Sequence, residues 1–86
     1  VPGNDSNQEI CSQVARLLRE ERQRQRLSLK VLAEQAGLSR QMVSYVEQQE
    51  RNPTLDTLLR LAMALDVKLE DLIKRARVSA EKQKSK

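Results

Sequence analysis

Apolar residues recur along this chain with the period of an α-helix, and they do so in five separate segments. The first stripe has members at i, i+4, i+7 and i+8: Ile10, Val14, Leu17 and Leu18. Residues at this spacing share one face of a helix and are expected to be buried together. Ser6 and Glu9 have the spacing of a capping box, so this helix is predicted to begin after Ser6 and to run to about Arg26.

The next two segments are short helices that meet at Gly37, where glycine can adopt a left-handed conformation without a Cβ clash. Ser28 can cap the first helix, and Ser39 can cap the second, which is predicted over about residues 40–48. The apolar face of the first comprises Leu29, Leu32, Ala33 and Ala36. In the second, Met42, Val43 and Val46 share one arc, and the opposite arc carries Arg40, Gln41, Ser44, Tyr45 and Gln48. Two helices in this layout are typical of a helix-turn-helix, which places its second helix in the major groove of DNA.

Two further helices complete the pattern. Thr54 can cap a helix with an apolar face of Leu55, Leu58, Leu61, Ala62 and Leu65. The last stripe comprises Leu69, Leu72, Ile73, Ala76 and Ala80. Strand-type alternation is absent, so the chain is predicted to form an all-α, compact five-helix domain. We expect a flexible lead-in over residues 1–6, the domain over 7–73 and a basic helical extension or tail over 74–86.

The residue types exclude several kinds of chemistry. With one cysteine, Cys11, and no histidine, the chain can build neither an internal disulfide nor a zinc site nor a His-based catalytic triad. Cys11 is predicted to be a small packing residue, and no metal, cofactor, small-molecule site or enzymatic activity is expected. No run of about 18 apolar residues is present, and the first residues lack the apolar core of a signal peptide, so we expect a cytoplasmic protein without a membrane partner.

The net charge of +4 is unevenly distributed. Residues 74–86 contain six Lys or Arg and one Glu, whereas residues 1–73 contain ten Lys or Arg and eleven Asp or Glu. The predicted domain is therefore nearly neutral, and any basic footprint within it depends on how its charges are arranged. The basic tail is either a solvated segment or an arm that assists DNA binding.

One set of residues is specific when taken in order and at its spacing: Leu32-Ala33, Ala36-Gly37-Leu38-Ser39, Val43, Val46-Glu47, Arg51-Asn52-Pro53-Thr54-Leu55, Leu58, Leu61-Ala62, Leu65 and Leu72. On these residues the chain resembles, over about residues 10–73, the lambda-repressor/Cro-like, or Xre-type, helix-turn-helix family. The resemblance implies a small prokaryotic transcription regulator that binds double-stranded DNA as a homodimer. Regulators of restriction–modification systems and antitoxin-like repressors have this build.

The chain departs from that family at three positions. Leu29 stands where the family often has a glutamine that contacts a phosphate, and Ser28 and Lys30 become the substitutes. Gln49 and Asp66 stand where glycines are usual after the third and fourth helices. Because glutamine tolerates a left-handed backbone poorly, the loop after residues 40–48 is expected to differ in shape.

The polar arc and the resemblance together predict a DNA-binding site. Its predicted members are Ser28, Lys30, Ser39, Arg40, Gln41, Ser44, Tyr45, Gln48, Arg51 and Asn52. Arg40 and Gln41 open the recognition helix, where arginine can pair with guanine and glutamine with adenine. Arg51 and Asn52, like Lys30, are candidates for phosphate contacts. Tyr45 either contacts DNA or covers the small core.

Two structural roles are also predicted. The resemblance implies an ion pair between Arg22 and Glu47 that would hold the recognition helix at its docking angle. The homodimer surface is assigned to leftover apolar positions near the end of the domain: Leu69, Leu72, Ile73 and Ala76. The leading hypothesis is a transcriptional regulator that reads a pseudo-palindromic operator, and the alternative is a protein-interaction adaptor that uses the same helical face.

Overall fold

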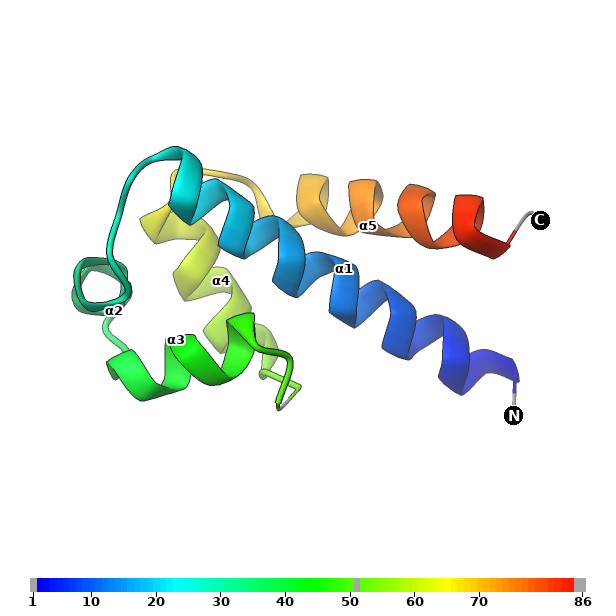
Figure 1. Cartoon of the computed structure of the whole chain (residues 1–86), viewed down its shortest axis with the longest axis horizontal. Coiled ribbons are helices and arrows are strands. Elements are labelled where there is room, and N and C mark those ends of the chain that lie inside the picture. Colours follow the sequence, from blue (N-terminus) through cyan, green and yellow to red (C-terminus); the bar gives the residue numbers. More distant parts are fainter. Residues whose placement is uncertain (1, 51, 85–86) are drawn as a thin grey trace.

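Five α-helices make up most of the chain (Figure 1). They are α1 (Pro2–Arg24), α2 (Leu29–Ala36), α3 (Arg40–Glu47), α4 (Leu55–Ala64) and α5 (Leu69–Lys84). The computed structural model describes residues 2–50 and 52–84, with side chains over 7–50 and 52–82, and no strand occurs in these ranges. The prediction of an all-α, five-helix fold is confirmed.

The first helix is longer than the sequence pattern suggested, and the last helix includes most of the basic segment, which was expected to be a helical extension or a tail. α1 begins at Pro2, so residues 2–6 are helical instead of forming a separate lead-in. Proline suits the first helical position, because the N–H that it lacks would have no partner within the helix. The Ser6 side chain of the predicted capping box lies outside the described side chains. α5 continues through the basic segment as far as Lys84.

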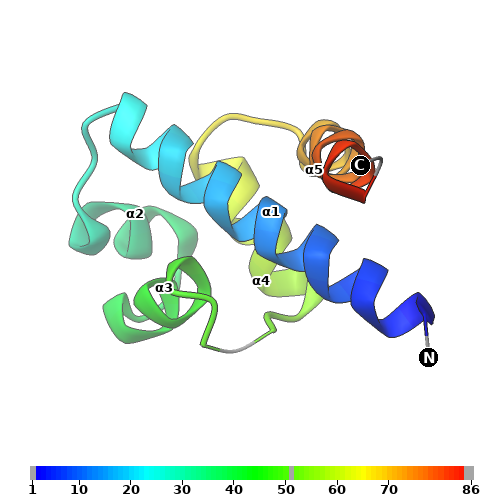
Figure 2. The same ribbon diagram turned by 45° about the vertical axis from the view of Figure 1, so that its right-hand side comes forward.

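The helices form two groups around one core. α1 and α5 lie side by side and run in opposite directions (Figure 1 and Figure 2). α3 packs against α1, and α2 packs against both α3 and α4. The buried cluster draws on all five helices and comprises Val14, Leu17, Leu18, Leu32, Ala33, Ala36, Val43, Val46, Leu61, Ala62, Leu65, Leu69, Leu72 and Ala76. All three core positions predicted in α3 face this cluster, with Met42 half-buried at its edge.

The predicted dimer surface on the last helix is wrong. Leu69, Leu72 and Ala76 are only 4%, 2% and 0% exposed, because the face of α5 that carries them packs against α1. Ile73 is half-buried against the same core. Ala80, further along the basic segment, is also buried, so that segment is packed onto the domain.

Most of the large apolar residues that are exposed lie on α4. Leu55, Leu59 and Met63 are 64%, 42% and 78% exposed and stand one turn apart, at i, i+4 and i+8. Leu55 was expected in the core and is not part of it. It occupies the first position of α4, at the edge of the fold, and Thr57 is the residue of that turn which is buried.

Each of the first four helices is followed, within two residues of its end, by a residue with a left-handed backbone: Arg26 (φ 59°), Gly37 (φ 70°), Gln49 (φ 61°) and Asp66 (φ 58°). In each case the amide of the following residue donates to the carbonyl five positions back, at 2.9–3.1 Å, which closes a Schellman motif. The turn after α3 therefore forms with Gln49 in the place where the family usually has glycine. Gln49 adopts the conformation that glycine usually supplies, at a cost of about 1–2 kcal/mol.

The predicted starts of α2, α3 and α4 are confirmed. The Oγ of Ser28 accepts from the Val31 amide at 3.1 Å, and the Oγ of Ser39 accepts from the Met42 amide at 3.0 Å. Thr54 caps α4 in the same way, through the Thr57 amide at 3.1 Å. These caps, with Gly37 between the first two, fix the two-helix unit of α2 and α3.

Candidate nucleic-acid interface

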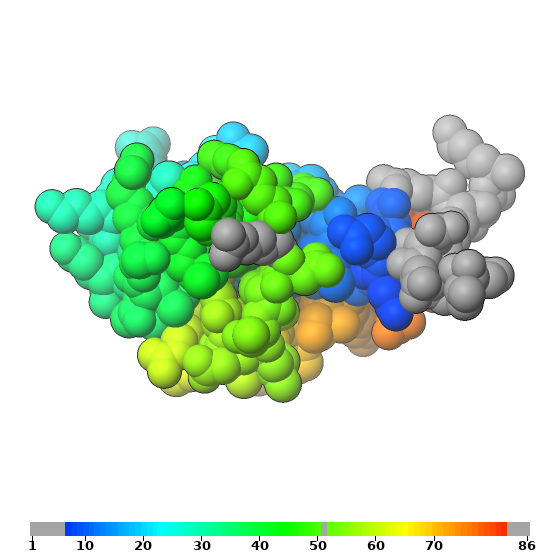
Figure 3. All heavy atoms as spheres, turned by 90° about the horizontal axis from the view of Figure 1, so that it is seen from below, coloured from blue at the N-terminus to red at the C-terminus, as the bar shows by residue number. Residues whose placement is uncertain are grey.

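α3 is held by one face and open on the other. Val43 and Val46 are buried against the core, which fixes the rotation of the helix about its axis. The opposite face carries the residues predicted to meet DNA: Arg40, Gln41 and Gln48 are exposed, and Ser44 and Tyr45 are half-buried. In Figure 3, α3 (green) forms part of the molecular surface between α2 (blue-green) and α4 (yellow-green).

Two hydrogen bonds organise this open face. The Gln41 amide donates to the Tyr45 hydroxyl at 2.6 Å, and the Gln48 amide donates to the Ser44 Oγ at 3.1 Å. Each bond joins residues one helical turn apart, so the polar side chains lie along the helix instead of extending freely. Within the described residues, the Arg40 side chain makes no ion pair or hydrogen bond, which leaves its guanidinium available at the start of α3.

The predicted flanking residues fall at two places. Ser28 and Lys30 are exposed at the N-terminal end of α2, which lies beside the second half of α3. Ser39 is the N-cap of α3, with its Oγ occupied as an acceptor and its hydroxyl hydrogen still able to donate. Asn52 is exposed in the loop between α3 and α4, and Arg51 lies outside the described residues.

The predicted ion pair between Arg22 and Glu47 is present and is largely buried. The Arg22 Nε and Nη2 donate to the two carboxylate oxygens of Glu47 at 2.7 and 3.0 Å, so the contact is bidentate. The remaining Nη1 donates to the Leu27 carbonyl at 2.7 Å. The two side chains are only 14% and 6% exposed. One guanidinium thus joins α1, the turn that follows it and the end of α3, and this fixes the position of the helix that carries the polar face.

A second polar cluster closes the end of α1. The hydrogen bond from Arg24, followed by that from Gln25, holds the pKa of the Glu21 carboxyl below its ordinary value of 4.5. The Gln25 amide also donates to the Leu65 carbonyl at 2.7 Å, which ties α1 to the end of α4. This cluster stabilises the scaffold behind the polar face and does not itself belong to that face.

The pattern of charged and apolar residues in the sequence did not identify two features of this surface. Arg19 lies on α1 beside Ser44 and Gln48 of the open face, yet nothing in the charged pattern of α1 distinguishes it from its neighbours. The exposed stripe on α4 has a visible period, but the period alone did not show that α4 has two apolar faces. Cys11, predicted to be a packing residue, is exposed.

Residues 2–50 and 52–84 contain no group of three or more His, Cys, Asp or Glu placed to hold a metal ion. None of the helices described is both long enough and apolar enough to cross a bilayer.

Comparison with known proteins identifies the matching part of the chain. The helix-turn-helix family matches residues 18–72, which contain α2, α3 and α4. Control protein C.SmaI from Serratia marcescens is 47% identical over 49 residues, covering 57% of this chain and 58% of that protein. The chain thus spans less than two thirds of this relative. The crystal structure of the restriction-modification controller protein C.AhdI from Aeromonas hydrophila matches with a TM-score of 0.67 and 38% identity, over 73% of this chain and 94% of that chain.

Proposed function

Because this chain belongs to the helix-turn-helix family, we propose that it is a transcriptional regulator that binds double-stranded DNA with α3 in the major groove. The observation that carries the proposal is the orientation of α3. Its valines are locked in the core, and its polar side chains are presented together on the outer face. A recognition helix needs this arrangement, because side chains can reach base edges only from a helix of fixed rotation.

We assign the recognition of DNA base sequence to the first turn of α3. Arg40 has an available guanidinium that can donate two parallel hydrogen bonds to the O6 and N7 of guanine, and Gln41 can pair with adenine. Ser44, Tyr45 and Gln48 follow on the same face and contact the bases or the flanking backbone. Each bidentate pair would discriminate against a wrong base by about 1–3 kcal/mol.

Phosphate contacts flank this helix on both sides. Ser28 and Lys30 at the start of α2, Ser39 at the cap of α3, and Arg51 and Asn52 in the following loop are the proposed contacts. Such contacts set the register of the protein on the duplex and carry no sequence information. The near-zero net charge of residues 1–73 is compatible with these contacts, because binding the phosphates requires only a few positive side chains beside α3.

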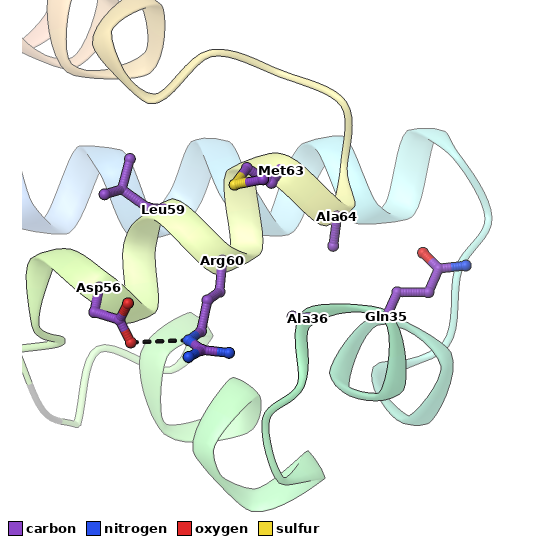
Figure 4. A pocket seen from close by; sticks show the side chains of 7 residues that line it. All are labelled: Gln35, Ala36, Asp56, Leu59, Arg60, Met63 and Ala64. Atoms are coloured by element: carbon purple, nitrogen blue, oxygen red, sulfur yellow. Dashed lines mark hydrogen bonds and ion pairs between the residues drawn. The ribbon is translucent and has the colours of Figure 1, made fainter.

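The regulator is proposed to act as a homodimer, with the stripe of Leu55, Leu59 and Met63 on α4 as its interface. This replaces the surface on α5, whose apolar face is already buried. Leu59 and Met63 line a hollow of about 570 Å³ between α4 and the end of α2, and Figure 4 shows the side chains that line it. Exposed apolar residues that line a hollow are typical of an interaction surface.

A second copy of the chain suits this stripe because the stripe is self-complementary. Asp56 and Arg60 form a 2.8 Å ion pair along its edge, with the acid nearer the start of α4 and the base nearer the end. In a two-fold pair of antiparallel α4 helices, Leu59 meets Leu59, Leu55 of each copy faces Met63 of the other, and the acid of each copy lies near the base of the other. Closed two-fold symmetry also fits two half-sites about 34–36 Å apart.

The dimer is tested by sedimentation of Leu59→Glu and Met63→Glu. We expect each variant to have the mass of a single chain at concentrations where the unaltered protein is dimeric. Val78→Glu, at an exposed apolar position on α5, is the matched control and should remain dimeric. Dimeric Leu59→Glu and Met63→Glu proteins would contradict this interface.

The DNA-binding proposal is tested by selecting bound sites from random duplex. A symmetric enriched motif is the expected result, with affinity that falls steeply as salt rises. Absence of enrichment would contradict the proposal and favour a protein-interaction module. The similarity to C.AhdI supports the narrower proposal that the regulated genes belong to a restriction–modification system. An enriched motif that lies upstream of such genes would support it, and a motif confined to unrelated promoters would contradict it.

A further inference from the structure

A small notch lies where α1, α2 and α3 meet, next to the open face of α3. Its volume is about 130 Å³, and it is lined by Arg19, Arg22, Leu29, Ser44, Glu47 and Gln48. Ser44 and Gln48 belong to the face proposed to meet DNA, so the notch opens along the edge of that face. A group bound in it would lie beside the recognition helix and not under it.

The charges of the notch leave one cation in excess. All three donor nitrogens of Arg22 are engaged, two by Glu47 and one by the Leu27 carbonyl, so this pair is internally neutral. Arg19 is exposed and makes no ion pair or hydrogen bond with any residue of the described chain. Its guanidinium therefore supplies the positive charge and the unused donors of the notch.

Leu29 and Ser44, which line the notch, belong to two other sources of donors. Leu29 is the first residue of α2, and the amides of Leu29 and Lys30 have no hydrogen-bond acceptor within the described residues, since Ser28 caps only the Val31 amide. Unpaired amides at a helix N-terminus favour an anion. The Ser44 hydroxyl accepts from Gln48 and can still donate its own hydrogen.

From these three sources of donors, we propose that the notch holds one phosphate group of bound DNA and that Arg19 is the side chain that grips it. This inference rests on the proposed DNA-binding function. The apolar Leu29 leaves the notch without a long polar side chain from α2, and Arg19 reaches it from α1 instead. Arg19 acts as a positioning residue, because a phosphate contact fixes the register of α3 without reading a base.

The inference is tested by measuring the affinity of Arg19→Ala for a selected site and for random duplex over a series of salt concentrations. We expect binding to weaken about tenfold per bound subunit, the value of one charge-assisted hydrogen bond, and by a similar factor on both DNAs. The slope of log affinity against log salt should become shallower by about 0.9 per bound subunit. Arg19→Lys should retain most of the slope, because it keeps the charge.

Lys68→Ala is the matched control, since Lys68 is exposed in the loop between α4 and α5, on the side of the molecule away from α3 (Figure 1). It removes one positive charge and should change affinity and slope little. Equal effects of Arg19→Ala and Lys68→Ala would overturn the inference while leaving the proposed function intact. Failure of the unaltered protein to bind any duplex would overturn both.

A second experiment locates the phosphate. Methylphosphonate linkages, which carry no charge, are placed at one position at a time along each half of the selected site. One position per half-site should weaken binding of the unaltered protein about tenfold and have little further effect on Arg19→Ala. If every position weakens the two proteins by the same factor, Arg19 holds no phosphate and the inference fails.

Discussion

Replacing Arg22 by alanine should destabilise the protein more than any other single removal of a charge. The substitution leaves the Glu47 carboxylate, which is 6% exposed, without its bidentate partner and also removes the donor to the Leu27 carbonyl. Breaking one side of a buried ion pair costs about 3–5 kcal/mol. Since Arg22 itself retains 14% exposure, the lower end of that range, about 3 kcal/mol, is the expected loss.

The loss is measured by urea unfolding followed by circular dichroism at 222 nm. Thermal unfolding gives a second measure: for a domain of this size, a loss of about 3 kcal/mol corresponds to a fall of about 12–24 °C in the thermal midpoint. Protein concentration must be the same for all variants, because a dimer gains apparent stability with concentration. Glu20→Ala is the control: its 2.6 Å ion pair with Arg16 lies on the exposed surface of α1 and should contribute under about 1 kcal/mol.

A double substitution distinguishes the loss of the ion pair itself from the cost of leaving one buried charge without a partner. Arg22→Met combined with Glu47→Leu replaces both charges with apolar side chains of similar size, so no buried charge is left alone. This double variant should be more stable than Arg22→Ala, as is found when buried ion pairs are replaced by packed apolar groups. If Arg22→Ala lies within about 0.5 kcal/mol of the unaltered protein, the size expected of an exposed pair, the structural role assigned to this ion pair is refuted.

Three further predictions concern the scaffold. Gln49→Gly should raise the free energy of unfolding by about 0.5–1 kcal/mol. Glycine removes the strain of the left-handed backbone, but it also raises the entropy of the unfolded chain, which offsets part of the gain. An unchanged urea midpoint would contradict the strain. Gly37→Ala should lower the free energy of unfolding by about 1–2 kcal/mol for the opposite reason, and equal stability would show that the turn is unstrained. Because the pKa of Glu21 is lowered, chiefly by Arg24, its contribution is complete above about pH 4.5 and is lost as pH falls through the lowered value. Glu21→Gln should therefore be less stable at pH 7 and lose stability less steeply below pH 4.5 in a pH series of urea midpoints, whereas parallel pH profiles would contradict the assignment.

The start and stop signals of the inner helices were readable from the sequence because they are local. A serine or threonine hydroxyl reaches an amide three residues ahead whatever the rest of the fold does, so Ser28, Ser39 and Thr54 were correctly placed as caps. The buried valines of α3 follow from period alone. The ion pair of Arg22 with Glu47, which spans distant parts of the chain, came from the family resemblance.

The two errors that concern apolar stripes share one physical cause. Period shows that a helix face is apolar, but it does not show what covers that face. The stripe on α5 was assigned to a second copy, whereas α1 covers it within the same chain. The stripe of Leu55, Leu59 and Met63 was overlooked because α4 has a second apolar face that meets the core.

The conformation of Gln49 shows how tertiary structure overrides a local preference. Glutamine disfavours positive φ, yet Gln49 adopts it where the chain leaves α3 in a Schellman turn and continues to the cap of α4. In this turn the Glu50 amide donates to the Tyr45 carbonyl at 3.0 Å. Arg19 presents a different limit. Arg19 is one of several arginines on α1, and only its position at the notch distinguishes it from the others. Three helices form that notch, so the sequence of α1 alone could not identify Arg19.

The central claim is that α3 reads base sequence through its exposed first turn. The most direct measurement is a repeat of the selection from random duplex with Arg40→Ala, beside the unaltered protein and Lys68→Ala. The unaltered protein and Lys68→Ala should enrich the same symmetric motif, and Arg40→Ala should lose the preference at one base pair of each half-site while keeping the others. The same full motif from Arg40→Ala, with only its affinity reduced, would contradict the claim.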